Sequence, residues 1–277
     1  MTSNKLFFST FVFSLLLALA SCGSKSTASD SQGTSSDSGQ EAPYGNPAAE
    51  GFRAEASDPK AIAIADEVME AMGGRKAWDG TPYLHWTFFG KRHLLWDKQN
   101  KQVRVESPEQ GLVIVTGIEE GSEGRVWKDG KELTDPESVA KYAKQGRSLW
   151  INDAYWLVMP YKLKDSGVAL SYVRQDTSYN GQPADVLGLQ FENVGDTPQN
   201  KYEVWVDQDS KLVTQWAYYA DAGDQDPKFV TPWADYKEYS GIMLSGDRRM
   251  AQLTNIQAPS SVPGQAFETG EMMLPLP

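Results

Sequence analysis

Residues 83–96 have the sequence Tyr-Leu-His-Trp-Thr-Phe-Phe-Gly-Lys-Arg-His-Leu-Leu-Trp, in which large apolar side chains recur at alternate positions. Aromatic residues are enriched in β-strands, and alternate side chains of a strand point to the same face. If the run forms one strand, Leu84, Trp86, Phe88 and Trp96 lie together on one face of it. The stretch therefore predicts a strand with a strongly apolar face within a β-sheet.

Further β-rich runs follow along the chain. Short polar segments separate neighbouring runs, and connections this short join antiparallel strands. Asn180-Gly181, for example, is typical of a two-residue hairpin turn. The expected strands span residues 102–106, 112–118, 125–128, 168–174, 186–191, 201–206 and 212–219, with shorter strands between 236 and 250 and near Phe267.

Two helical stretches accompany these strands. We expect a helix between Ser57-Asp58-Pro59, an N-cap followed by proline, and Gly73-Gly74, which favours a helix end. A second stretch opens at Asp135-Pro136-Glu137, is interrupted by Gly146 and stops at Pro160. About ten antiparallel strands, an N-terminal helix and a mid-chain helical insertion together indicate an α+β fold.

The N-terminus has the features of a bacterial export signal. Lys5 provides a short positive region and residues 6–19 an apolar run that is too short for a comfortable membrane span. Leu19-Ala20-Ser21-Cys22 then resembles a lipobox, at which a peptidase cuts before the cysteine and acyl chains are added to it. We therefore expect residues 1–21 to be a lipoprotein signal peptide and Cys22 to be the lipid anchor. The alternative is an ordinary secretory signal with a coincidental cysteine.

Composition divides the remaining chain into two parts. Residues 23 to about 50 are rich in Ser, Gly, Thr, Asp, Ala and Pro, and they hold too few apolar side chains to offset the entropy of ordering. We expect residues 22–56 to form an acylated, flexible tether. Residues 57–277 have the length and composition of a single domain.

Charge and cysteine content exclude several functions. Removal of residues 1–21 takes away Lys5 and no acidic residue, which leaves 25 basic and 37 acidic side chains and a formal charge of −12. Nucleic-acid binding requires a basic surface, so this acidic balance argues against it. Once Cys22 is acylated, no thiol remains for a disulfide, a zinc site or a nucleophile.

Catalytic motifs are scarce, and we expect neither an enzyme nor a cofactor. The two histidines, His85 and His93, lie more than about 25 Å apart if residues 83–96 form one strand, unless the chain bends at Gly90. In one continuous strand the two histidines are too distant to share a metal ion. No Gly-x-Ser-x-Gly nucleophile elbow is present.

Two loops have a partial likeness to ion sites. Asp176 to Gly181 matches the first half of an EF-hand loop, but position twelve is Leu187 rather than glutamate, so a hairpin turn is favoured. Gly73-Gly74-Arg75 has the composition of a phosphate nest, but a helix C-cap accounts for the two glycines. We therefore predict no metal site and no catalytic residue.

Aromatic residues are the remaining feature, with nine Trp, twelve Tyr and ten Phe. On the strand over 201–206, Val204 and Val206 share a face and Trp205 lies on the other. One apolar face of the sheet packs as core. The other either is covered by a helix, lines a groove for an acyl chain, or stacks on sugar rings. The residues expected to line such a groove are Leu84, Trp86, Phe88, Trp96, Val204, Val206 and Trp216.

Several motifs resemble known families. Lys201-Tyr-Glu-Val-Trp-Val-Asp207, a turn and Leu212-Val-Thr-Gln-Trp216 are similar to a strand pair of the LolA and LolB lipoprotein carriers, and Gly241-Ile-Met-Leu244 is similar to one of their late strands. Gly73-Gly-Arg-Lys-Ala-Trp78, Phe89-Gly-Lys-Arg-His93 and Tyr155-Trp-Leu-Val-Met-Pro160, together with Asn193-Val-Gly-Asp-Thr-Pro198, resemble an uncharacterised family of bacterial envelope lipoproteins. The resemblance covers residues 57–277.

The resemblance implies a curved antiparallel half-barrel that wraps helices over an apolar cavity. It also implies a non-catalytic envelope lipoprotein, held at the outer membrane by its acyl chains, that binds a lipid acyl chain or a lipoprotein. The periplasmic carrier has no lipid anchor, so Cys22 is a difference from it. The cysteine favours a likeness to the membrane-anchored receptor instead. A structural or carbohydrate-contacting surface lipoprotein is the alternative.

A Cys22→Ser variant tests the anchor. Without the thiol that accepts the acyl chain, we expect the exported protein to be released from the membrane or to stay unprocessed. Membrane fractionation and the mass of the N-terminal peptide measure both outcomes. Normal processing with membrane retention would contradict the prediction.

Overall fold

The computed structural model describes residues 45–277 except 193, 194 and 250. The expected signal peptide, Cys22 and most of the tether lie outside the described residues. Within the described part, no helix is both long and apolar enough to cross a membrane.

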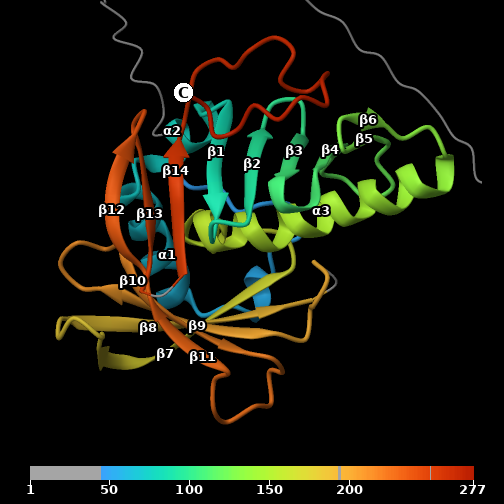
Figure 1. The fold of residues 1–277 in the computed structure, drawn as a ribbon. Coiled ribbons are helices and arrows are strands. Elements are labelled where there is room, and N and C mark those ends of the chain that lie inside the picture. The colour runs from blue at the N-terminus through green and yellow to red at the C-terminus, as the bar shows by residue number, and fades with distance from the viewer. Residues whose placement is uncertain (1–44, 193–194, 250) are drawn as a thin grey trace, which may run out of the picture. The chain divides into compact units, whose positions relative to one another are not determined.

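Two antiparallel sheets form the folded part, which is an α+β fold as predicted (Figure 1). The nine-stranded sheet has the order β12-β13-β14-β1-β2-β3-β4-β5-β6, and the five-stranded sheet has the order β11-β10-β9-β8-β7. Neither sheet closes into a barrel. The described residues contain more strands than the ten expected, because residues 83–96 form two strands, three strands lie between 234 and 257, and β6 and β11 were not predicted.

The elements have the following bounds. The α-helices are α1 (Pro59–Ala71), α2 (Gly74–Gly80) and α3 (Pro136–Val158). The nine-stranded sheet contains β1 (Tyr83–Phe88), β2 (Arg92–Asp97), β3 (Gln102–Ser107), β4 (Leu112–Gly117), β5 (Gly124–Lys128), β6 (Lys131–Glu132), β12 (Ala234–Tyr239), β13 (Ile242–Arg248) and β14 (Ala251–Gln257). The five-stranded sheet contains β7 (Val168–Thr177), β8 (Pro183–Phe191), β9 (Lys201–Asp207), β10 (Val213–Tyr219) and β11 (Phe229–Pro232).

Helix α3 passes between the two sheets and supplies the centre of the core (Figure 1). The ring of Trp156 contacts Phe88 of β1 at 6.5 Å between centroids and Trp216 of β10 at 4.8 Å. The chain crosses from one sheet to the other between β11 and β12, at the buried Trp233. The mid-chain helical insertion predicted from the sequence is therefore the element to which both sheets are packed.

Gly146 does not interrupt α3, contrary to the sequence prediction. The helix is continuous over 23 residues, and its N-cap Asp135 accepts a hydrogen bond from the backbone N–H of Ser138 at 2.9 Å. A Cβ atom on Gly146 would lie 2.7 Å from Cγ2 of Ile114 on β4. The glycine is there because helix and sheet approach closely, and this packing offsets its unfavourable helix propensity.

The prediction of one strand over residues 83–96 is wrong, because the run folds into the β1–β2 hairpin. Phe88 pairs with Arg92, and the three residues between them form a tight turn in which Phe89 and Gly90 both have positive φ. Leu84 pairs with Trp96, so the even-numbered apolar residues still share one face. The hairpin also brings the two histidines to one face, since Thr87 pairs with His93 two residues after His85.

Two further boundaries differ from the sequence analysis. Gly73, with a φ of +106°, ends α1, but a second helix, α2, begins at the next residue. The sequence analysis did not predict α2, because it interpreted Gly-Gly only as the end of a helix. The segment around Phe267 forms a turn rather than a strand.

Residues 45–56 also pack on the domain, although they fall in the segment expected to be a tether. The backbone N–H groups of Ala49 and Arg53 donate to Lys164 and Val168, and Phe52 packs against the core.

We expect Gly146→Ala to lower the free energy of unfolding by about 1–3 kcal/mol, because the added methyl overpacks the contact with Ile114. Gly80→Ala is the matched control, since a Cβ at Gly80 meets nothing within 4 Å. Urea denaturation of both variants measures the difference. Equal stability of the two variants would show that α3 can move away from β4.

Candidate functional site

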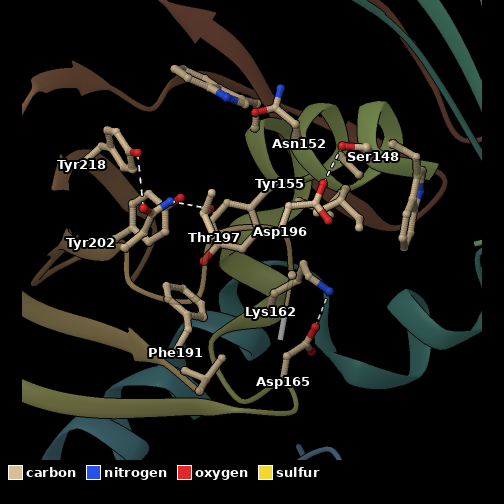
Figure 2. A pocket seen from close by; sticks show the side chains of 18 of the residues that line it. Ser148, Asn152, Tyr155, Lys162, Asp165, Phe191, Asp196, Thr197, Tyr202 and Tyr218 are labelled. Atoms are coloured by element: carbon tan, nitrogen blue, oxygen red, sulfur yellow. Dashed lines mark hydrogen bonds and ion pairs between the residues drawn. The ribbon is translucent and has the colours of Figure 1, made fainter. Parts of the chain in front are cut away.

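A partly open cavity of about 650 Å³ lies between α3 and one end of the five-stranded sheet (Figure 2). One wall is the C-terminal half of α3, and the facing wall comes from β8, β9, β10 and β11. The residues between β8 and β9 and those that follow α3 complete it. Its size lies within the range of about 300–1,000 Å³ that is usual for small-molecule sites.

Aromatic side chains form the interior of this cavity. Nine of the lining residues are aromatic, and the alternation of β9 and β10 directs Tyr202 and Trp216 inward. Their rings stack at 5.1 Å with an interplanar angle of 7°. Tyr155 of α3 lies 5.4 Å from Tyr202, and Phe191 of β8 meets Tyr202 edge-on at 5.5 Å. This geometry fixes the rings against each other and leaves a rigid apolar wall.

A second group of rings extends this wall along the sheet. Trp156 stacks on Phe229 of β11 at 5.5 Å, and Tyr218 stacks on Phe229 at 5.2 Å. On the side of the nine-stranded sheet, Trp96 of β2 and Trp150 of α3 meet edge-to-face at 5.2 Å. Aromatic residues from both sheets and from the helix between them therefore converge on one cavity.

Polar side chains surround the mouth, and they are more exposed than the rings. Ser148 donates a hydrogen bond to the Asp196 carboxylate, and Lys162 forms an ion pair with Asp165. Thr197 accepts a hydrogen bond from the Asn200 amide at 2.6 Å (Figure 2). Asn152, Ser166 and Asp196 are exposed, whereas the lining aromatic residues are buried or half-buried. The cavity is thus apolar within and polar at its entrance.

Several polar atoms of the lining rings have no hydrogen-bond partner among the described residues. They are the hydroxyl of Tyr155 and the indole nitrogens of Trp96, Trp150 and Trp216. Burial raises the pKa of Tyr155 well above its ordinary value and that of Tyr202 to about 12, so both phenols stay neutral at physiological pH. An unsatisfied buried donor costs roughly 1–3 kcal/mol, and such groups are otherwise uncommon in proteins.

The cavity coincides only partly with the residues expected from the sequence. Trp96 and Trp216 line it. Leu84, Trp86, Phe88, Val204 and Val206 lie instead in the packed core, outside this lining.

Most of the lining was missed because it comes from a helix and a loop rather than from strand alternation. The run Leu149 to Met159 contains Trp150, Tyr155 and Trp156, and this density of rings within one helix was the available indication. Nothing local shows that the loop carrying Asp196 and Thr197 lies across from that helix.

The two histidines lie away from the cavity, on the opposite face of the β1–β2 hairpin. His85 is fully buried, and its Nδ1 lies 2.7 Å from the carbonyl oxygen of Leu94. Its Nε2 accepts the backbone N–H of Leu276 at 3.4 Å, which fixes a neutral tautomer. His93 Nδ1 lies 2.7 Å from the Thr87 hydroxyl. Among the described residues, no group of three or more His, Asp or Glu side chains is placed to hold a metal ion.

Comparison with known proteins gives a partial likeness of fold. No family model and no curated protein matches the sequence. A DUF1329 family protein from Desulfovibrio piger ATCC 29098 is similar over 76% of this chain and 98% of its own, at 13% identity and a TM-score of 0.44. MucB in complex with MucA(peri) is similar over 76% of this chain and 59% of its own, at 12% identity and a TM-score of 0.22. The Pseudomonas aeruginosa MucA/MucB complex covers 64% and 59%, at 15% identity and 0.23. Similarity at this level assigns neither a family nor a function.

Burial makes the stability of the fold depend on the charge of His85. Loss of solvation lowers the pKa of His85 from 6.5 to about 4, so the unfolded chain binds a proton that the folded chain rejects. The folded state keeps its full stability above pH 6.5 and loses stability as the pH falls towards 4, and the total loss is on the order of 3 kcal/mol.

We expect His85→Gln to flatten the pH dependence of unfolding between pH 7 and pH 4.5, measured by urea titration. Carboxylates titrate in the same range, so the comparison is with His93→Gln, which leaves the buried ring in place. An unchanged slope in His85→Gln relative to His93→Gln would contradict the assignment.

Proposed function

We propose that this protein binds an amphipathic, mainly apolar ligand in the cavity between α3 and the five-stranded sheet, without catalysis. The observation that supports the proposal is the division of the lining, with buried aromatic rings inside and exposed Asn152, Asp196 and Thr197 at the mouth. A lipid acyl chain would occupy the interior, and its polar end would remain at the wet entrance.

The size of the cavity is sufficient for useful affinity. Each buried methylene contributes about 0.8 kcal/mol, so roughly ten methylenes correspond to micromolar binding before the entropy of association is subtracted. The rings of Tyr202 and Trp216 are already stacked, which reduces the ordering required on binding. The net charge of the lining is balanced, because Arg147 and Lys162 are matched by Asp165 and Asp196. This balance favours an uncharged or zwitterionic ligand.

The N-terminal sequence supports a location of this binding activity at a membrane. Acylation of Cys22 would tether the domain to the bacterial envelope, at the outer membrane, where lipids and lipoproteins are the abundant apolar ligands. The acidic surface charge of the chain leaves the acyl chains as the means of attachment.

The chemistry of the lining supports binding rather than turnover. Ser148 is hydrogen-bonded directly to Asp196, with no histidine between them to act as the base of a triad. Lys162 is paired with Asp165, and both tyrosines of the interior are neutral. None of these groups is arranged as an activated nucleophile.

Carbohydrate binding is the second candidate, and a specific observation favours it. The cavity wall is aromatic more than aliphatic, and the amides of Asn152 and Asn200 and the carboxylate of Asp196 lie beside the rings. Sugar-binding sites combine stacked rings with such groups. The relative affinities for a fatty acid and for oligosaccharides distinguish the two ligands.

We expect Asn152→Trp to weaken binding of a fluorescent fatty acid at least tenfold in the full chain, because the new indole fills the mouth of the cavity. Asn152 is exposed, but its amide donates to the buried Asp153 carboxylate at 2.9 Å, so the melting temperature is measured beside the affinity and should fall by no more than a few degrees. Fluorescence titration measures the affinity.

Lys144→Trp is the matched control, since Lys144 is an exposed residue of α3 outside the lining. No fatty-acid binding by the natural chain, together with binding of an oligosaccharide that Asn152→Trp abolishes, would select the second candidate. Binding of neither would reject the cavity as a ligand site.

A further inference from the structure

The C-terminal segment, residues 266–276, crosses the outer face of the nine-stranded sheet without joining it (Figure 1). This face is the one that does not contact α3. It presents His85 from β1, Leu95 from β2, Arg104 and Glu106 from β3, and Trp127 from β5. The segment itself contains neither helix nor strand.

The sheet holds the segment mainly through its backbone. Arg104 donates to the carbonyl oxygens of Ala266 at 3.1 Å and Thr269 at 2.6 Å, and also to that of Glu271. Arg125 donates to the carbonyl oxygen of Glu268 at 2.8 Å. These two arginines therefore donate hydrogen bonds to four main-chain carbonyl groups, which belong to the end of a turn and to the segment that follows it.

Main-chain N–H groups of the segment are bound as well. The Glu106 carboxylate accepts from Met273 at 3.0 Å and from Leu274 at 3.2 Å, and His85 accepts from Leu276. Glu106 also accepts from Arg104 at 2.6 Å, and both side chains are completely buried. The sheet thus provides hydrogen-bond donors for the carbonyl groups of the segment and hydrogen-bond acceptors for its N–H groups.

Apolar contacts fix the register of the segment. Leu274 and Leu276, two residues apart, pack on Leu95 in one cluster. Gly270 lies over the indole of Trp127, so closely that a Cβ there would be 2.2 Å from the ring. Phe267 packs against Trp127 and the neighbouring valines of β4. The residues on either side, such as Met272 and Pro275, point to solvent.

A permanently buried sheet face does not need this arrangement. Replacing a buried ion pair by apolar side chains of similar volume is often neutral or stabilising, so Arg104 and Glu106 are weak contributors to stability. They are well suited, however, to a surface that is sometimes exposed to water, where both charges are solvated. Recognition through backbone groups also depends little on the sequence of the bound chain.

We propose that the outer face of β1 to β5 is a peptide-binding surface, and that residues 266–276 are its resident ligand within the same chain. The partner is a segment of another protein chain that carries two apolar side chains separated by one residue, as Leu274 and Leu276 are. Exposed residues 260, 261, 263, 264 and 265 connect the segment to β14, so it can leave without breaking the sheet. This surface is separate from the cavity and its proposed ligand.

Cleavage of the connection tests the proposal. A protease site inserted between Ser260 and Ser261 in the full chain allows the folded protein to be cut, after which a labelled peptide of residues 266–277 is added. We expect the peptide to replace the cut fragment at a ratio of one to one while the melting transition of the domain is retained. A peptide with Asp in place of Leu274 and Leu276 should bind at least tenfold more weakly.

A protein variant supplies the complementary measurement. Arg125→Gln removes one backbone contact, the exposed ion pair with Glu132 and the contact with the Trp127 ring, so peptide affinity should fall several-fold while the melting transition of the domain is retained. Lys128→Gln, on the same strand, is the control that should bind as the natural chain does. A fragment that stays bound until the domain unfolds, or a domain that unfolds when the fragment leaves, would overturn the proposal. A stable dimer formed by exchange of intact segments would show that the surface serves a second copy instead.

Discussion

The packing of one helix against two sheets is the constraint on which the rest of the structure depends. Trp156 of α3 touches Phe88 in one sheet and Trp216 in the other, so neither sheet can move without disturbing the helix. Gly146 allows the N-terminal half of α3 to lie close to β4. The C-terminal half is held further from the five-stranded sheet by its large rings, and the cavity lies where those rings and the sheet do not meet. The absence of a side chain at Gly146 therefore allows close packing at one end of α3, and the large rings at the other end leave the cavity open.

The aromatic wall of the cavity is rigid, and several of its buried polar atoms have no hydrogen-bond partner among the described residues. Tyr155, Trp150 and Trp216 are fixed by neighbouring rings, yet their polar atoms have no partner within the described part of the chain. Leu or Phe at such positions would avoid the desolvation penalty, although the indole nitrogens of Trp86 and Trp233 in the packed core also have no partner among the described residues. Rings with one polar atom are useful where a ligand supplies an acceptor, and this gives a physical reason for their presence beside an opening.

Local sequence patterns were sufficient for the elements but not for their assembly. Strand alternation placed Leu84 and Trp96 on one face, and Asp58-Pro59 located the first helix, because these features depend on neighbours in sequence. The hairpin at Phe89-Gly90 was missed because aromatic residues rarely take a positive φ, and the continuity of α3 because Gly146 is explained only by Ile114 on another element. The site was predicted in part for the same reason. Trp96 follows from the strand parity of residues 83–96 and Trp216 lies on the predicted strand over 212–219, whereas Tyr155 and Asp196 come together only through tertiary packing.

The pairing of β1 with β14 has a consequence for how the protein is made. His85 lies opposite Gln257 in the ladder, so the central strand of the larger sheet lacks one neighbour until almost the whole chain is available. Contacts so distant in sequence close slowly, since the loop entropy must be overcome before the pairing is gained. A chain released from the N-terminus onwards therefore stays incomplete and open until its last strands arrive. The larger sheet is therefore completed only when the last strands are available, and a chain that ends before β14 would leave one edge of β1 unpaired.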